Sequence, residues 1–332
     1  MPSTVTCFRP YRNTDSPALA DLWNQGLPER GVVRPLTVHE FDALVMGKLG
    51  FEREGLIVAE RDGRVVGYAH AGFGPVQERG PSHRLDFSMG TVALMVLEPG
   101  LDEPEIEAGL FQEAEHYLRQ RGAEVIYAGG RHPLDPFYWG IYGGSEFAGV
   151  LGTHESFHRA ALRRGYQPMA QAVLLELELA DLPPADPRAI LLRRQVRFES
   201  AEDVLPDGWW QALAIGLFRP SRFALVDRAT GEPIARAMTW DVACGVGIDD
   251  GRPRTALIGL EVVPPRRRQG FGRLLVAEIA RHCREQYAEV LLAQTDQTNA
   301  AALALYASLD FEPVDRATLY RLPGPPEGRA GG

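Results

Sequence analysis

The sequence lacks several features that define large classes of protein. Its 332 residues include three cysteines, Cys7, Cys244 and Cys283, which are too few and too scattered for a disulfide framework or a cysteine-rich metal site. No apolar run reaches the roughly 18 to 20 residues of a membrane span. The N-terminal stretch MPSTVTCFRP also lacks the apolar core of a signal peptide. We therefore expect a cytoplasmic protein with no membrane partner.

Lysine is nearly absent, and acidic side chains outnumber basic ones. Lys48 is the one lysine, so almost all of the 35 basic residues are arginines, against 44 acidic residues and a net charge of −9. This balance disfavours nucleic acid as a partner and favours a cationic substrate such as an amine. The 45% hydrophobic content is typical of a globular protein, and the length predicts two domains of roughly 150 residues each.

A proline-rich segment near the middle divides the chain. Residues 181–189 follow a strand-like run and predict a linker between an N-terminal domain at 1–180 and a C-terminal domain at 190–322. Residues 323–332 can bury almost nothing and predict a disordered tail.

Both halves show the same order of predicted elements. In each, a strand, a helix and a hairpin precede a strand, a long helix, a strand, a helix and a closing strand. Asp62-Gly63 marks the first hairpin turn, and the second half is expected to open with a strand at 191–198. We predict an α/β (α+β) fold of two tandem domains, each with a mixed central β-sheet flanked by helices.

The sharpest local signal is a loop between a strand and a helix, which reads Pro264-Pro265-Arg266-Arg267-Arg268-Gln269-Gly270-Phe271-Gly272-Arg273. Helix N-termini present unpaired N–H groups, and glycines let the backbone approach a phosphate. The loop has no Gly-Lys-Ser/Thr, as a Walker loop requires, and Leu275 replaces the third glycine of a dinucleotide fingerprint. It predicts another kind of anion site; the alternative is an arginine-rich helix start that binds nothing.

Two motifs resemble those of GNAT acetyltransferases. Arg267-x-x-Gly270-x-Gly272 resembles the family's Q/R-x-x-G-x-G/A acetyl-CoA loop, and Asn299-x-x-Ala302-x-x-Leu305-Tyr306 resembles its N-x-x-A-x-x-L-Y element. Asp310 replaces the usual glycine in the following turn, where aspartate can still adopt left-handed geometry. The resemblance implies two tandem GNAT-like domains that use acetyl-CoA to acetylate a primary amine, on a small molecule or a peptide, by direct attack in a ternary complex.

The resemblance also implies roles for individual residues. Tyr306 would protonate the departing CoA thiolate, although a core aromatic is the alternative. Asn299 would hydrogen-bond the cofactor arm, the main chain of Val262 and Val263 would pair with the pantetheine, and loop amides would hold the pyrophosphate. The implied cofactor-binding residues are Val262, Val263, Arg267, Arg268, Gln269, Gly270, Phe271, Gly272, Arg273, Asn299 and Ala302.

The sequence leaves the identity of the general base undecided. Several family members carry a glutamate eleven residues before the first Arg or Gln of the loop, where this chain has Ala256. Glu261 is on the alternate face of its strand unless a bulge re-aims it, and Asp241 is the other candidate. Both can instead be solvated carboxylates, with a chain of waters carrying the proton.

The N-terminal half departs from these motifs. Its matching loop, residues 98–107, carries five carboxylates, which would repel a pyrophosphate, and Ala161 stands where Tyr306 stands in the second half. We expect this half to be structural or to wall the substrate pocket. A tandem architecture with an active C-terminal copy is similar to that of mycothiol synthase. The pair Thr239-Trp240, near the end of the second predicted hairpin, is loosely similar to that enzyme as well.

Two other functions remain as alternatives. The chain could be a catalytically silent CoA-binding or interaction module, although the retained Asn299 and Tyr306 favour an enzyme. His154-Glu155-x-x-His158 matches the H-E-x-x-H pattern, which on a helix can hold zinc for a hydrolase. The aromatic and glycine-rich stretch at 136–144 could line a pocket or fold over its own core.

Overall fold

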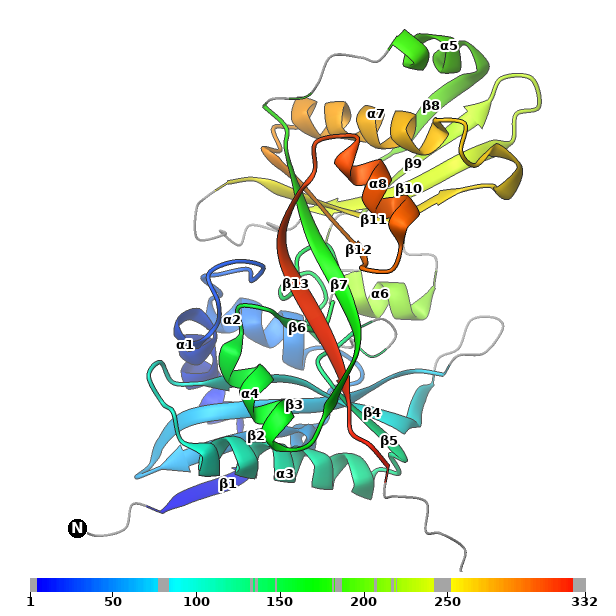
Figure 1. Ribbon diagram of the computed structural model, residues 1–332. Helices are drawn as coiled ribbons and strands as arrows, with labels where there is room; N and C mark the ends of the chain where they lie inside the picture. The colour runs from blue at the N-terminus through cyan, green and yellow to red at the C-terminus, as the bar shows by residue number, and fades with distance from the viewer. Residues whose placement is uncertain are drawn as a thin grey trace, which may run out of the picture.

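The computed structural model of the chain describes residues 5–76, 84–131, 134, 137–146, 148–180, 182, 187–205, 208–215, 218, 220–241 and 252–324. Within these residues the strands form one 13-stranded mixed sheet, which runs through two lobes (Figure 1). Its order is β1-β2-β3-β4-β5-β13-β7-β12-β11-β10-β9-β8, and β6 pairs with β13 beside this path.

The N-terminal half forms the lower lobe of Figure 1. Its strands are β1 (Thr6–Pro10), β2 (Leu56–Arg61), β3 (Arg64–Pro75), β4 (Leu85–Leu97), β5 (Val125–Ala128), β6 (Val150–Leu151) and β7 (Gln167–Glu178), and its helices are α1 (Ser16–Gly26), α2 (Val38–Phe41), α3 (Pro104–Gln120) and α4 (Glu155–Arg163). The predicted turn between β2 and β3 is confirmed, because Asp62 and Gly63 both have positive φ, at 51° and 76°.

The C-terminal half forms the upper lobe. Its strands are β8 (Val196–Ala201), β9 (Ser221–Asp227), β10 (Pro233–Asp241), β11 (Arg254–Val262), β12 (Val290–Asp296) and β13 (Glu312–Arg321), and its helices are α5 (Pro187–Gln195), α6 (Trp209–Ile215), α7 (Phe271–Glu285) and α8 (Ala300–Ala307). The strand expected at 191–198 was wrong in its first part, since a helix continues to Gln195. Pro187 is preorganised for a first helical turn, and good helix formers follow it.

The segment predicted as a linker lies only partly within the described residues. Positions 181 and 183–186 are outside them, and 187–189 begin α5. Most of the predicted tail, 325–332, is also outside them, as is Cys244. The predicted boundaries of the two domains stay a prediction.

The closing strand of each half completes the sheet of the other half. β13 pairs with β5, where Tyr320 lies opposite Ala128, while β7 pairs with β12, where Leu174 lies opposite Gln294. Between these contacts β7 and β13 pair with each other in antiparallel register. Figure 1 shows them as the two long strands that cross from one lobe to the other. The halves therefore share the centre of one sheet.

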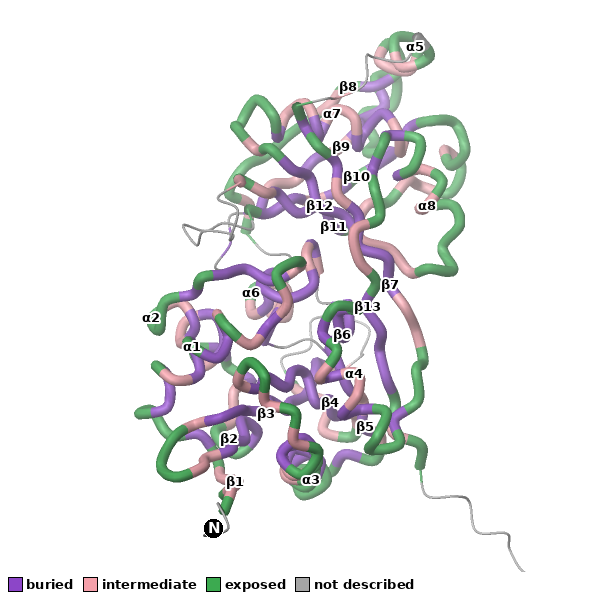
Figure 2. Tube along the Cα trace, turned by 60° about the vertical axis from the view of Figure 1, so that its left-hand side comes forward, coloured by how far each residue is buried: buried purple, intermediate pink, exposed green. Residues whose placement is uncertain are grey.

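The buried apolar residues form two cores, which appear as buried tube in both lobes of Figure 2 and are separated by the C-terminal part of the sheet. One core lies under α7, where Leu275, Ile279 and Cys283 are all buried. The larger core fills the N-terminal half and extends to Trp240 and Ala256 on the opposite face of the C-terminal sheet. That face of the C-terminal half is thus packed against N-terminal residues.

In the part of the chain that the structure describes, no helix is both long enough and apolar enough to cross a membrane.

Candidate active site

Strands β11 and β12 pair at one end and then diverge. They are hydrogen-bonded in parallel only where Arg254 to Ala256 lie opposite Val290 to Leu292, although β11 runs on to Val262 and β12 to Asp296. We call residues 257–262 of β11 and 293–296 of β12 the fork. Because main-chain groups in a strand need partners, a divergent pair of strands offers donors and acceptors to an extended ligand.

A β-bulge changes the direction of side chains on the β11 arm of the fork. The pairing with β10 shifts register between Arg236 and Met238, and Gly259 opposite this point has a φ of +62°. Beyond the bulge Glu261 is exposed, and its Oε2 accepts hydrogen bonds from Arg236 Nε at 2.9 Å and Nη2 at 2.6 Å. The first candidate base is therefore ion-paired at the surface.

The predicted anion loop closes the open end of the fork and starts α7. Gly270 is the residue before the first helical turn, with a φ of +94°, and Arg268 takes a φ of +61°, which is uncommon for a residue with a side chain. Arg267 Nε donates to the main-chain oxygen of Val262 at 2.8 Å, and Gln269 Nε2 donates to that of Pro265 at 2.9 Å. These bonds fix the loop through its own carbonyls, and the first-turn amides of α7 face outward from a positive helix end.

The two valines at the end of β11 differ in their roles. The Val263 amide donates to Ile234 on the β10 side at 2.9 Å, so it is already used within the sheet. Because successive residues of a strand direct their main-chain groups to opposite edges, those of Val262 face the fork. Its oxygen there already accepts from Arg267, so a ligand contact at Val262 would be made by the amide. Val262 thus fits the predicted contact with an extended ligand better than Val263 does.

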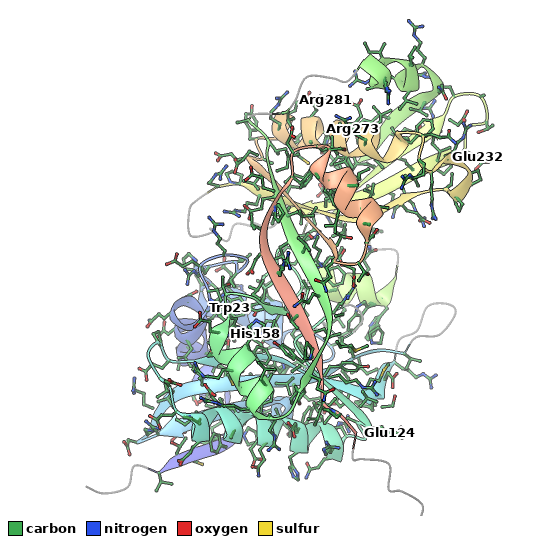
Figure 3. All side chains as sticks on the ribbon, viewed as in Figure 1. Trp23, Glu124, His158, Glu232, Arg273 and Arg281 are labelled. Atoms are coloured by element: carbon green, nitrogen blue, oxygen red, sulfur yellow. The ribbon has the colours of Figure 1, made fainter. Side chains whose placement is uncertain are left out.

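A basic cavity of about 560 Å³ lies beside the loop, between α5 and α7. Its lining includes the guanidinium groups of Arg188, Arg268, Arg273 and Arg281 together with apolar side chains such as Leu192. Figure 3 shows Arg273 and Arg281 along α7 next to α5. The contribution of α5 was missed from the sequence, because its residues were interpreted as linker and strand. A cavity of this kind suits a ligand with several phosphates and an apolar part.

The second predicted motif forms α8, directly after the β12 arm of the fork. Asn299 caps this helix, its Oδ1 accepting from the Ala302 amide at 3.1 Å, which leaves its Nδ2 as a donor. Tyr306 is 5% exposed and packs against Phe311. Burial, and then the nearby Glu146 carboxylate, raise the pKa of Tyr306 to about 12. Asp310 has a φ of 64°, as predicted for the turn after the helix.

Side chains from the N-terminal half reach this site, although the sequence did not single out Arg131 or Glu146. Arg131, which follows β5, makes an ion pair of 2.9 Å with Asp296 at the tip of β12. Glu146 lies against β12 as well, with its Oε2 3.4 Å from Gln294 Nε2. With the Gln294 amide turned by 180°, its nitrogen instead donates to the main-chain oxygens of Glu146 at 3.1 Å and Gly143 at 3.3 Å. In either orientation Gln294 anchors this loop to β12.

A second cavity, of about 550 Å³, lies between the two halves on the sheet face opposite α7. Its charged lining consists of Glu29, Arg30, Glu176, Glu178, Arg252, Arg254, Glu312 and Asp315. Carboxylates outnumber guanidinium groups there, so the cavity favours a polar cation. The predicted aromatic stretch contributes in two ways: Tyr138 and Tyr142 are buried in the N-terminal core, while Gly140 and Gly144 line the cavity.

The remaining predicted residues lie away from the fork. Asp241 is opposite Thr255, near the end of β11 that is remote from the loop. His154 and His158 do not meet at a common point: His154 Nδ1 bonds the Tyr142 hydroxyl at 2.9 Å, whereas both ring nitrogens of His158 bond protein oxygens. No cluster of three metal-ligating side chains occurs among the described residues. The geometry gives the zinc-hydrolase alternative no support.

Arginines neutralise the acidic loop of the N-terminal half. Glu98 pairs with Arg64, Glu103 with Arg61, and the buried Glu107 with both Arg159 and Arg163. Glu103 precedes the first turn of α3 and Glu105 lies within it, where negative charge interacts favourably with the helix N-terminus. The N-terminus of α3 is therefore already occupied by carboxylates of the protein itself.

Comparisons with known proteins give one family and one type of fold. Residues 187–311 match the model of the Acetyltransferase (GNAT) family. No curated protein sequence matches the chain. Among solved structures, a tandem GNAT protein from the clavulanic acid biosynthesis pathway, solved without AcCoA, is 15% identical with a TM-score of 0.65, covering 97% of this chain and 99% of that one.

Two further structures are similar over the same length. A GCN5-related N-acetyltransferase from Sphaerobacter thermophilus is 14% identical with a TM-score of 0.62, covering 96% of this chain and 97% of that one. A GCN5-related glucosamine N-acetyltransferase region in a fungal multi-domain GH3 β-N-acetylglucosaminidase is 15% identical with a TM-score of 0.69. The match covers 97% of this chain but 38% of the fungal one. These likenesses confirm the predicted fold of two tandem GNAT-like domains, whereas the similarity to mycothiol synthase stays a prediction.

Proposed function

We propose that this chain transfers the acetyl group of acetyl-CoA to a primary amine in its C-terminal half, where residues 187–311 match the model of the Acetyltransferase (GNAT) family. The observation that carries the proposal is the fork with the anion loop at its open end and Tyr306 on the helix that follows it. The basic cavity between α5 and α7 supports the cofactor, since its four arginines match the phosphates of CoA. The residues present therefore fit the cofactor, with basic groups for its phosphates and an open strand edge for its arm.

The proposed reaction is a direct attack within a ternary complex. The loop amides and arginines hold the CoA phosphates, and the main chain of β11 aligns the extended arm along the fork. The acceptor nitrogen attacks the thioester carbonyl, the C–S bond breaks, and Tyr306 gives its phenolic proton to the thiolate. A phenol whose pKa lies near 12 remains protonated at neutral pH, as an acid must.

The acceptor in this proposal is a small-molecule or peptide amine. The carboxylate-rich cavity between the halves supports a cationic acceptor, and the net charge of −9 argues against nucleic acid. The N-terminal half is assigned no acetyl-CoA, since carboxylates already occupy its matching helix end. Purified protein incubated with acetyl-CoA and a panel of amines tests the proposal by release of free thiol. Tight acetyl-CoA binding with no thiol release from any amine would instead favour a silent CoA-binding module.

Tyr306→Phe should lower kcat by about 100-fold, because loss of a general acid typically costs 10²–10⁴ in rate. Acetyl-CoA binding should change little, since the hydroxyl acts on the leaving thiolate rather than on the phosphates. Steady-state kinetics and isothermal titration with acetyl-CoA measure the two effects separately.

Tyr117→Phe provides a matched control for this substitution. Tyr117 is also buried and its hydroxyl donates to Glu52 at 3.1 Å, but it lies in α3 of the N-terminal half. Its loss should cost about 1 kcal/mol of stability and leave kcat unchanged. Equal losses of kcat in the two variants would remove Tyr306 from the reaction.

A further inference from the structure

We propose that Glu146, from the N-terminal half, is the general base that takes the proton of the acceptor amine, so that the two halves together form the active site. The inference rests on the acetyl transfer proposed above. It assigns a catalytic role to a half whose own loop carries carboxylates in place of a phosphate site.

The loop that carries Glu146 is seated on the C-terminal sheet by specific contacts. Trp240 of β10 donates its indole N–H to the main-chain oxygen of Ser145 at 3.2 Å. Gly140 lies so close to this ring that a Cβ would be 2.7 Å from Trp240, and its φ of +84° also suits glycine. Trp240 lies opposite Ala256 of β11, whose small side chain leaves the sheet face open to the loop. These contacts fix the residue that precedes Glu146.

The carboxylate of Glu146 is directed to the β12 arm of the fork. In one orientation of its amide Gln294 donates to the carboxylate at 3.4 Å, and in the other it holds the main-chain oxygen of Glu146 instead. Arg131 lies close enough to interact with the carboxylate electrostatically but is ion-paired with Asp296. Among the described residues no ion pair engages Glu146 itself. A base must be free to accept a proton, and this arrangement positions the carboxylate without neutralising it.

Glu146 and Tyr306 both lie beside the β12 arm of the fork, Glu146 against Gln294 and Tyr306 on the helix that follows β12. The Glu146 carboxylate contributes to the raised pKa of Tyr306, so the two groups are close enough to interact although no hydrogen bond joins them. Burial raises the pKa of Glu146, and Gln294 and Arg131 only partly oppose this effect. The pair thus has one group suited to accept a proton near neutral pH and one suited to donate it.

The other carboxylates near the fork are engaged elsewhere. Glu261 is held at the surface by Arg236, and Glu176 of β7 makes an ion pair of 2.9 Å with Arg254. The β11 residues that face the N-terminal half are Ala256 and Ile258, which carry no titratable group. Glu146, by contrast, directly follows Gly144 and Ser145, which line the acidic cavity between the halves. Glu146 itself is not among the lining residues, so an acceptor bound in the cavity would meet it beside the wall that Gly144 and Ser145 form.

The proton transfers balance over the whole reaction. Glu146 takes one proton from the ammonium form of the acceptor, and the neutral nitrogen forms a C–N bond with the thioester carbonyl carbon. The C–S bond then breaks, the thiolate takes the proton of Tyr306, and the second nitrogen proton restores the phenol. The products are the acetylated amine and CoA thiol, and Glu146 returns its proton to solvent.

The test compares the pH dependence of Glu146→Gln with that of the wild type. In the wild type kcat/KM should fall at low pH as Glu146 becomes protonated, with a midpoint above the ordinary pKa of a glutamate because burial raises it. In Glu146→Gln the acceptor must arrive already neutral. Its kcat/KM should drop about 100-fold at neutral pH and then rise about tenfold per pH unit toward the pKa of the amine.

Two further variants make this result specific. Glu312→Gln removes one carboxylate from the same cavity, so it should raise KM for the amine and leave the shape of the pH profile unchanged. Glu261→Gln tests the rival base. Thermal unfolding and acetyl-CoA titration of each variant establish that the fold and the cofactor site are intact.

Each outcome separates the two proposals. A wild type that acetylates no amine would overturn the proposed function. A working wild type together with a Glu146→Gln variant that keeps the wild-type profile, or loses activity equally at every pH, would overturn only the role of Glu146. If the fall of kcat/KM at low pH disappears in Glu261→Gln, then Glu261 rather than Glu146 is the general base.

Discussion

Replacing Thr318 by proline is expected to destabilise both halves of the molecule together. Thr318 lies in β13 between two partners, opposite Val150 of β6 and Gln171 of β7, and it is 6% exposed. Proline has no N–H and cannot continue the ladder of a strand that is paired on both sides. We expect a loss of about 3 kcal/mol or more, a large part of the roughly 5–15 kcal/mol that stabilises a typical domain.

Hydrogen exchange measured in β4 and β11 reports the two halves separately. Exchange should accelerate in both strands, because β13 completes the N-terminal sheet at β5 and also pairs with β7, the strand that completes the C-terminal sheet at β12. The matched control is Thr6→Pro at the start of the edge strand β1, which pairs only with β2, and there a smaller effect confined to the N-terminal half is expected. Faster exchange in β11 alone after Thr318→Pro would contradict the shared sheet.

Gly270→Glu should abolish acetyl-CoA binding. The new carboxylate would stand at the helix end that we assign to the pyrophosphate, and repulsion of about 4 kcal/mol corresponds to about a thousandfold weaker binding. The φ of +94° adds strain of about 1–2 kcal/mol for any residue with a Cβ. A Cβ at this position would also lie 3.1 Å from Leu192 of α5. Titration calorimetry with acetyl-CoA measures the change in Kd.

Gly231→Glu separates the effect of strain from that of charge. Gly231 has a φ of +73° in the turn before β10, and a Cβ added there would have no other atom within 4 Å. The same substitution therefore meets similar backbone strain away from the loop, so it should lower stability without changing Kd. If Gly270→Glu binds acetyl-CoA as tightly as the wild type, the assignment of the cofactor to this loop is wrong. If the wild type binds two equivalents of acetyl-CoA and Gly270→Glu still binds one, the remaining site lies in the N-terminal half.

The features predicted from the sequence are those that a short segment determines by itself. The loop at 264–273 follows a strand and starts a helix, and its glycines and arginines are adjacent in the chain, so its place at the start of α7 could be inferred locally. The Asp62-Gly63 turn and the left-handed Asp310 were predictable for the same reason. Asn299 and Tyr306 are seven positions apart on one helix, and their spacing alone brings them to the same site.

The features that were missed depend on contacts between distant parts of the chain. Nothing in β7 or β13 indicates that each pairs with a strand of the other half, because the composition of a strand does not specify which of several possible neighbours it pairs with. Glu146 stands in a loop with no motif, and it reaches Gln294 of β12 only through the folded arrangement of the halves. The helix α5 was missed because a proline-rich approach resembles a linker.

The shared strands also set the order of events while the chain is being synthesised. β5 has its outer partner only when Tyr320 can reach Ala128, and β7 has its partner β12 only after the C-terminal half has been made. At roughly 5–20 residues per second, the ribosome takes about 10–40 s to travel from the first of these positions to the last. Throughout that interval β5 presents an unpaired edge, which makes the nascent N-terminal half a natural client for chaperones that cover exposed strands.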